Sequence, residues 1–170
     1  VQERTESVQT VNDTAAQATC QIIVRKDSGI TTVDDLVGRT VSIGAAESGT
    51  EKNAEEILKV SGITKELVRT VNMDYSEAAA RLEAGEIDAM FCTSGIRTGI
   101  IEQLSKSCDI SLVSLDDKCI EKLLMAYPLY ESCTIPANTY TGQSEPVYTI
   151  GIIIGTALTF ILCDFTGRTK

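Results

Sequence analysis

A short stretch near the start of the chain combines small residues and hydroxyl groups in a pattern typical of anion binding. Residues 41–51 read Val-Ser-Ile-Gly-Ala-Ala-Glu-Ser-Gly-Thr-Glu. The first three predict a short strand, and the apolar spacing that follows predicts a helix over 51–60. The first amide N–H groups of a helix have no partner within it and lie at the positive end of its dipole. Ser48, Gly49 and Thr50 are therefore predicted to hold a carboxylate or a phosphate.

Two other interpretations of this stretch stay open. Ser48 or Thr50 is equally well explained as the N-cap of an ordinary helix, which is the commonest use of such residues. The spacing of Gly44 and Gly49 also matches that of a nucleotide-binding P-loop, but Thr50 stands where that motif has its lysine. Because the charge needed at the β- and γ-phosphates is missing, nucleotide hydrolysis is disfavoured.

Composition restricts the partners and the chemistry. The 170 residues carry a formal net charge of −9 and include no histidine. An acidic surface repels nucleic acids, so we expect no nucleic-acid partner. The lack of histidine removes the usual general base and the commonest metal ligand. Asp116, Asp117 and Glu121 lack the glycine-containing spacing of a calcium loop, and we expect neither a metal nor a cofactor.

The six cysteines are spread along the chain without a CxxC pair, so the spacings of zinc sites and thioredoxin-like sites are absent. Most are expected to be buried free thiols. Cys108 and Cys119 border the same predicted strand and are the pair we expect if a disulfide forms. Cys92 directly follows residues 88–91 of a predicted buried strand and is the one candidate nucleophile, but no histidine is present to activate it.

Residues 147–163 form a long apolar run that contains two glycines and three threonines. The run is shorter than the usual membrane span. Its β-branched residues favour buried strands with a break near Gly155, and a membrane helix stays the alternative. Residues 1–18 are polar and acidic, and they do not have the pattern of a secretory signal peptide.

The predicted elements alternate between strands and helices along most of the chain. Strands are predicted over 20–25, 40–43, 67–72, 87–92 and 110–115, and helices over 32–38, 51–60, 76–84, 98–105 and 118–127. This order predicts an α/β fold with a doubly wound, mostly parallel sheet. Ligands of such sheets bind beyond the carboxyl ends of the strands. Both the 48–50 turn and a second polar turn, Thr93-Ser94-Gly95, fall at that edge.

The ordered set of these motifs resembles the second lobe of the TAXI family of solute receptors of TRAP transporters. The Ser-Gly-Thr turn alone is shared by many binding proteins of this fold, so the order of the motifs is the specific signal. The resemblance covers roughly residues 20–165. The matching segments are 30–51, 75–79, 82–91, 93–97, 135–143 and 147–150.

The resemblance implies an extracytoplasmic receptor of the type II periplasmic-binding-protein fold, periplasmic or extracellular, with or without a membrane anchor. Such a receptor captures a small organic anion, such as glutamate or a dicarboxylate, and delivers it to a TRAP membrane permease without catalysis. Two other classes of protein share the architecture and stay open as alternatives. One is an enzyme of the transferase or dehydratase type, and the other is the effector-sensing domain of a regulator.

The resemblance also assigns ligand contacts. The 48–50 turn would hold the ligand carboxylate, and the 93–95 turn would line the same cleft. Tyr140 would lie near the hinge, where packing is the more expected role. Arg97 stands where family members usually have proline, and it would either pair with a ligand carboxylate or face solvent. The implied ligand-binding residues are Ser48, Gly49, Thr50, Thr93, Ser94, Gly95, Arg97 and Tyr140.

Compared with the family, the first lobe is missing before residue 20, and the chain resembles a fragment. We therefore expect a poorly defined N-terminal segment over 1–19 and an α/β ligand-binding lobe over 20–133. Residues 134–170 would be a return segment that belongs to the hinge and to the incomplete first lobe. Hinge surface left exposed in this way would favour a homodimer.

Overall fold

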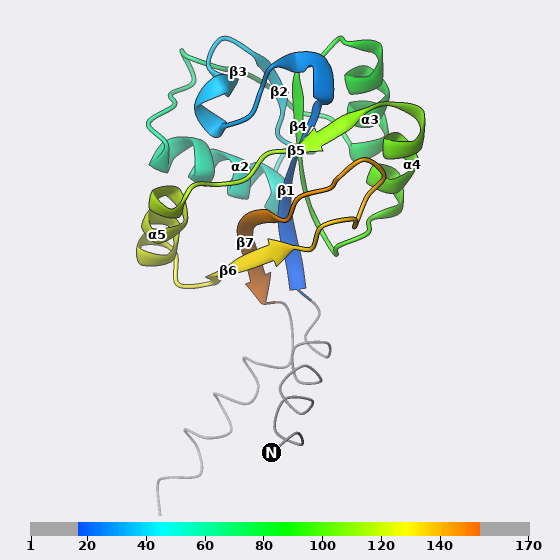
Figure 1. Ribbon diagram of the computed structural model, residues 1–170. Coiled ribbons are helices and arrows are strands. Elements are labelled where there is room, and N and C mark those ends of the chain that lie inside the picture. Colours follow the sequence, from blue (N-terminus) through cyan, green and yellow to red (C-terminus); the bar gives the residue numbers. More distant parts are fainter. Residues whose placement is uncertain (1–16, 154–170) are drawn as a thin grey trace, which may run out of the picture.

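One long strand, β1 (Gln17–Arg25), lies at the centre of a seven-stranded sheet. The computed structural model describes residues 17–153 (Figure 1). On one edge β1 pairs with β4, and on the other edge it pairs with β7 near its start and with β5 near its end. The order of the longest path through the sheet is β3-β2-β4-β1-β7-β6. The remaining strands are β2 (Thr40–Ser42), β3 (Arg69–Val71), β4 (Ala89–Ser94), β5 (Ile110–Leu112), β6 (Tyr130–Ile135) and β7 (Val147–Ile153).

The strands run mostly in one direction. The pairings give β2, β3, β4, β5 and β7 a common direction and leave only β1 and β6 opposed to it. The predicted α/β fold with a mostly parallel sheet is therefore confirmed. The prediction did not foresee that β1 is antiparallel to each of its neighbours, because alternation of strands and helices does not determine the direction of the first strand.

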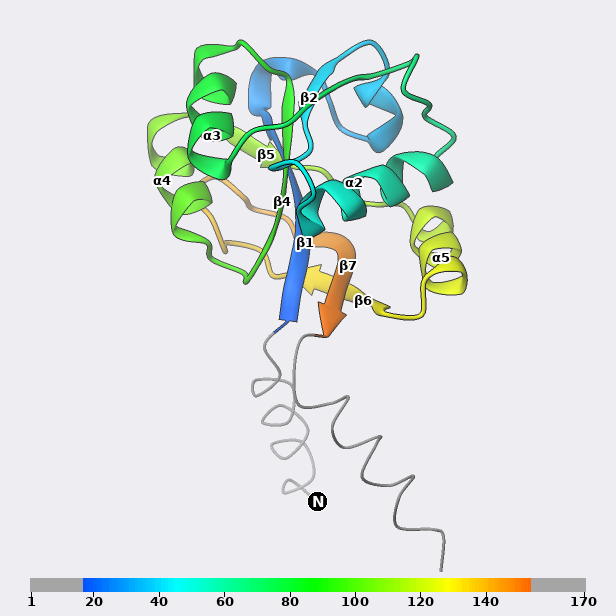
Figure 2. The ribbon, with the colours of Figure 1, turned by 180° about the vertical axis from the view of Figure 1, so that it is seen from behind.

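Four helices cover the two faces of the sheet (Figures 1 and 2). On one face α2 (Gly49–Val60) and α5 (Asp117–Ala126) pack against the sheet through buried apolar residues such as Ile57 and Leu123. On the other face α3 (Tyr75–Ala84) and α4 (Gly99–Ser107) bury residues such as Leu82 and Ile101. Both faces of β4 are therefore covered, which explains its uninterrupted apolar run. The doubly wound arrangement is confirmed.

Some predicted boundaries were wrong. The expected helix over 32–38 is only the 3-10 turn η2 (Val33–Leu36), which follows a second 3-10 turn, η1 (Lys26–Ser28). Strand β4 ends at Ser94 rather than at residue 92. Most of β6 was not predicted, because the residues of this edge strand before Ile135 are partly buried or exposed and lack a clear apolar alternation.

Cys108 and Cys119, the pair expected if a disulfide forms, are both free thiols, as are Cys20 and Cys92. The Sγ of Cys119 lies 3.6 Å from the hydroxyl of Ser61. A disulfide requires two cysteines whose Cα atoms lie within about 7 Å of each other. The spacing of two cysteines in the sequence does not show whether the fold brings them that close.

Strand β7 agrees with the strand expected at the start of the apolar run of residues 147–163. Residues 154–163 of that run, including Cys163, lie outside the described residues. Among residues 17–153, no helix has both the length and the apolar character needed to cross a membrane.

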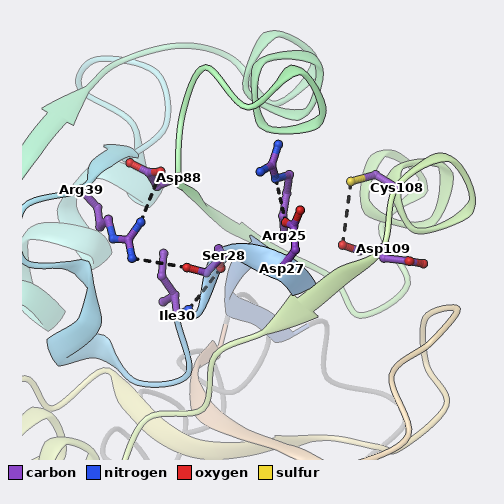
Figure 3. Close-up of polar contacts among 8 residues, drawn as sticks. All are labelled: Arg25, Asp27, Ser28, Ile30, Arg39, Asp88, Cys108 and Asp109. Atoms are coloured by element: carbon purple, nitrogen blue, oxygen red, sulfur yellow. Dashed lines mark hydrogen bonds and ion pairs between the residues drawn. The ribbon is translucent and has the colours of Figure 1, made fainter.

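Charged side chains tie together the strand ends at the amino-terminal edge of β2 and β4 (Figure 3). The carboxylate of Asp88 accepts a hydrogen bond from the amide of Thr40 at 2.8 Å and lies 3.9 Å from the Arg39 guanidinium. Arg39 also donates to the carbonyl oxygen of Ser28 at 3.3 Å. Asp88 therefore joins the starts of the two parallel strands.

We expect Asp88→Ala to lower the free energy of unfolding by about 2 kcal/mol, because it removes a charged acceptor of a strand amide. Urea unfolding followed by circular dichroism measures the change. Glu86→Ala is the matched control, since the Glu86 carboxylate lies on the surface 3.8 Å from Arg81; it should cost no more than about 0.5 kcal/mol. Equal losses in the two variants would contradict this role for Asp88.

Candidate functional site

The turn between β2 and α2 is shaped by Gly44. This buried residue has φ +89°, and a Cβ placed on it would lie 2.8 Å from the Cβ of Thr50. The carbonyl oxygen of Gly44 accepts hydrogen bonds from the amide of Met73 at 3.2 Å and from the side chain of Asn72 at 3.1 Å. The turn is therefore packed tightly against the first turn of α2, with a conformation that glycine adopts without strain.

The start of α2 keeps free donors. Ser48 is the N-cap, and its hydroxyl oxygen accepts from the amide of Glu51 at 3.2 Å. The N-cap interpretation of Ser48 is therefore confirmed. The Ser48 cap bonds only the amide of Glu51. The amide N–H groups of Gly49 and Thr50 donate to no acceptor among residues 17–153. Gly49 is exposed, so a donor at the positive end of the helix dipole faces solvent.

Thr50 points inward and contacts Tyr75. The side chain of Thr50 is 4% exposed, and its hydroxyl lies 2.5 Å from the hydroxyl of Tyr75. The Tyr75 hydroxyl also accepts from the amide of Thr93 at 3.2 Å and lies 3.2 Å from the Thr93 carbonyl oxygen. Burial raises the pKa of Tyr75, which keeps its hydroxyl protonated. Tyr75 thus joins the turn before α2 to the end of β4.

The role of Tyr75 was missed by the sequence reasoning. The predicted helix began at Ser76, but Asp74 is the N-cap and its carboxylate accepts from the amide of Glu77 at 2.8 Å. Tyr75 is therefore the first residue of α3. An aspartate three residues before a glutamate is a capping signal, and it could have placed Tyr75 at the same sheet edge as the two polar turns.

The second predicted turn begins later than expected. Thr93 and Ser94 are the last residues of β4, so their side chains point to opposite faces of the sheet. In the sheet register Thr93 lies opposite Cys20, whereas the Ser94 hydroxyl lies 3.4 Å from the Sγ of Cys92. The two hydroxyls therefore lie on opposite faces of the sheet at its carboxyl edge. Gly95 follows at the exposed turn.

Tyr140 is part of the core. It is 3% exposed, and its hydroxyl donates to the Oε1 of Gln21 at 2.6 Å and accepts from the amide of Arg97 at 3.2 Å. Gln21 in turn donates to the Ser94 hydroxyl at 3.4 Å. Burial raises the pKa of Tyr140. The residue therefore packs beneath the turn and holds its backbone.

Arg97 has a left-handed backbone with φ +66°, and its side chain is exposed. Its guanidinium forms no ion pair with any residue of the described range. Because the Arg97 amide donates to Tyr140, the backbone is fixed while the charged end stays available.

The two turns lie at the same edge of the sheet. Strands β2 and β4 are parallel neighbours, so their carboxyl ends are adjacent, and Tyr75 bridges them. The start of α2 at Gly49 and the turn at Gly95 and Arg97 are among the parts of this edge that are open to solvent. The hydroxyls of Thr50 and Tyr140 bond within the protein instead.

Nucleophilic chemistry finds no support at Cys92. This thiol is fully buried, and desolvation raises its pKa, which favours the unreactive protonated form. Within the described part of the chain, no group of three or more acidic or cysteine side chains is arranged to hold a metal ion.

The model of the NMT1-like family matches residues 3–159. Among solved structures, the periplasmic aliphatic sulphonate binding protein SsuA from Escherichia coli is 17% identical, with 58% of this chain and 32% of that chain covered and a TM-score of 0.49. An ancestral arginine-binding protein bound to arginine is 20% identical, with 85% of this chain and 50% of that chain covered and a TM-score of 0.44.

A third structure comes from work on glutathione import via GshT and the cystine ABC importer TcyBC of Streptococcus mutans. It is 15% identical, with 87% of this chain and 51% of that chain covered and a TM-score of 0.48. The chain thus spans between about a third and a half of the length of these structures.

We expect Gly44→Ala to lower the free energy of unfolding by about 3 kcal/mol, from backbone strain and from the clash with Thr50. Gly29→Ala is the matched control, because Gly29 also has a positive φ, +75°, but nothing lies within 4 Å of its added Cβ. This control should lose only about 1 kcal/mol. Urea unfolding of both variants tests the packing of the turn, and similar losses would contradict it.

We expect Tyr75→Phe to cost about 1–2 kcal/mol of stability, because the Thr50 hydroxyl and the Thr93 amide lose their partner. Two-dimensional amide NMR should show the largest shift changes at these two residues. Tyr148→Phe is the control, since its side chain is 52% exposed and its hydroxyl bonds to no described residue. If the amide NMR signals of Thr50 and Thr93 stay unchanged in Tyr75→Phe, the proposed connection through the Tyr75 hydroxyl is contradicted.

Proposed function

The chain belongs to the NMT1-like family, and from this premise and the open sheet edge we propose that it is the ligand-binding lobe of an extracytoplasmic solute receptor. The receptor captures a small organic anion, such as glutamate or a dicarboxylate, in the periplasm or outside the cell. It delivers the anion to a membrane permease of the TRAP type. The ordered motifs that resemble the TAXI receptors are what favour this transporter class.

The free amides at the start of α2 carry the proposal. Two N–H groups, those of Gly49 and Thr50, donate to no described residue at the positive end of a 12-residue helix. Parallel donors of this kind suit the two oxygens of a carboxylate. Arg97 would supply the second set of donors, since a guanidinium binds a carboxylate through two hydrogen bonds. We propose that residues 48–50, 95 and 97 make the ligand contacts in this lobe.

Tyr75 supports the same site without contacting the ligand. Its hydroxyl holds Thr50 and the backbone of Thr93 in place, so the two turns keep their separation before a ligand arrives. Donors that are positioned in advance lose less conformational entropy on binding. Thr93, Ser94 and Tyr140 would act in the same indirect way, through the packing of the turn.

Two lobes that close around the anion would complete the site. We propose that residues 20–133 form most of the ligand-binding lobe and that residues 134–170 lead toward the hinge and the other lobe. The start of β1, from Gln17, and strand β7 pair with each other within the sheet of this lobe. One lobe by itself would offer a half-open site and would bind the anion weakly. An enzymatic role is less favoured, because the one candidate nucleophile, Cys92, is buried with a raised pKa.

The sharpest test removes one free amide and keeps the helix. Gly49 is the first residue of α2, where proline is well tolerated, and Ser48 before it has φ −82° and ψ 161°, which suits a following proline. We expect glutamate or succinate, titrated into the whole chain, to shift amide NMR signals at residues 48–50. Gly49→Pro should weaken that binding about tenfold or more, because a charge-assisted hydrogen bond is lost.

Gly99→Pro is the matched control, because Gly99 is the first residue of α4 and its surroundings are equally open. It makes the same substitution at another helix start and should leave the affinity within about twofold of the wild type. Equal weakening by both variants, or carboxylate-induced shifts that avoid residues 48–50, would contradict the proposed site.

A further inference from the structure

A polar cavity of about 390 Å³ lies at the other end of α2. It is bounded by the last turn of α2, the first turns of α5, the η2 turn and the loop after β5. A helix rises about 1.5 Å per residue, so this end lies about 17 Å along the axis from the start of α2. The cavity, called the α2–α5 cavity below, is therefore separate from the proposed carboxylate site.

Three lysines line this cavity: Lys59 from α2, and Lys118 and Lys122 from α5. None of them forms an ion pair with a residue of the described range, whereas Lys65 and Lys106 elsewhere do. Lys118 and Lys122 are four residues apart on one helix, a spacing at which like charges repel. The protein as a whole carries a net charge of −9, yet these three positive charges are grouped without partners. Their mutual repulsion raises the electrostatic free energy of the folded protein, and a bound anion would offset it.

Two carboxylates also line the cavity, and they do not cancel the lysines. Asp116 is the N-cap of α5, and its carboxylate accepts from the amide of Cys119 at 2.7 Å. It therefore lies against the positive end of the helix dipole, which offsets its charge. Asp34 is exposed on the η2 turn. The balance of three lysines, two carboxylates and a helix start leaves the cavity positive.

We propose that the α2–α5 cavity binds a small inorganic dianion of the phosphate type. Each lysine ammonium offers three donors on a flexible stem, and ammonium groups from two helices can surround a tetrahedral anion from different sides. Such binding would join the end of α2 to the start of α5. It would also remove the repulsion between the lysines.

The test titrates sodium phosphate into the full 170-residue chain, with sodium chloride at matched ionic strength as the reference, and follows the amide NMR signals. We expect shifts at residues 59–62 and 116–122. The double variant Lys118→Ala/Lys122→Ala should weaken phosphate binding about tenfold or more. Lys26→Ala/Lys106→Ala makes the same change in net charge outside the cavity, and it should leave the affinity within about twofold.

Gly49→Pro separates this inference from the proposed function, because it alters the other end of α2 and should leave phosphate binding at residues 116–122 unchanged. Circular dichroism of each variant checks that it is folded. The inference is overturned if phosphate shifts no signals around the cavity beyond those shifted by chloride. Equal weakening by the two lysine pairs, or shifts confined to residues 48–50, would overturn it too.

Discussion

The rest of the structure depends on the pairing of β1 along both of its edges. Residues 19–24 pair with β4 on one edge, and the other edge is divided between β7 and β5. A strand surrounded in this way must satisfy every polar group that it carries. The carbonyl oxygen of Cys20 accepts from the hydroxyl of Thr149 at 2.7 Å, and Gln21 bonds with Tyr140 and Ser94. The central strand thus bonds to Tyr140 and Thr149, which are more than a hundred residues away from it in the sequence.

This arrangement determines where the open edge lies. Because β4 is held between β1 and β2, its carboxyl end must lie beside the end of β2. The helices α2 and α3 begin next to those ends, and the hydroxyl of Tyr75 connects them. The free amides of Gly49 and Thr50 and the exposed side chain of Arg97 therefore extend from a backbone that the core already holds in place. The proposed site would therefore need little rearrangement to accept an anion.

The two ends of α2 have different electrostatic properties that suit the two proposals. The start of the helix offers amide donors and the positive end of the dipole, whereas the last turn offers Lys59, whose charge is favourable at a helix C-terminus. An anion at either end meets local donors even though the protein carries a net charge of −9. Local geometry, and not the overall charge, would govern the binding of anions to this protein.

Features that depend on neighbouring residues could be predicted from the sequence. The helix expected over 51–60 is α2 (Gly49–Val60), and its N-cap is Ser48. The α/β alternation was also visible, because periodicity and capping are properties of short segments. The amide donors of the candidate site could be predicted in the same way, since the first amide N–H groups of any helix have no partner within the helix.

Features that join distant segments were decided only by the tertiary structure. These include the opposed direction of β1, the extension of β4 to Ser94, the burial of Tyr140 and the bridge made by Tyr75. The same holds for the α2–α5 cavity, whose lysines come from residues 59 and 118–122. Each depends on which side chains meet after the sheet has formed. The sequence by itself therefore determined the local donors, while the fold decided which of them stay open to a ligand and which are used inside the protein.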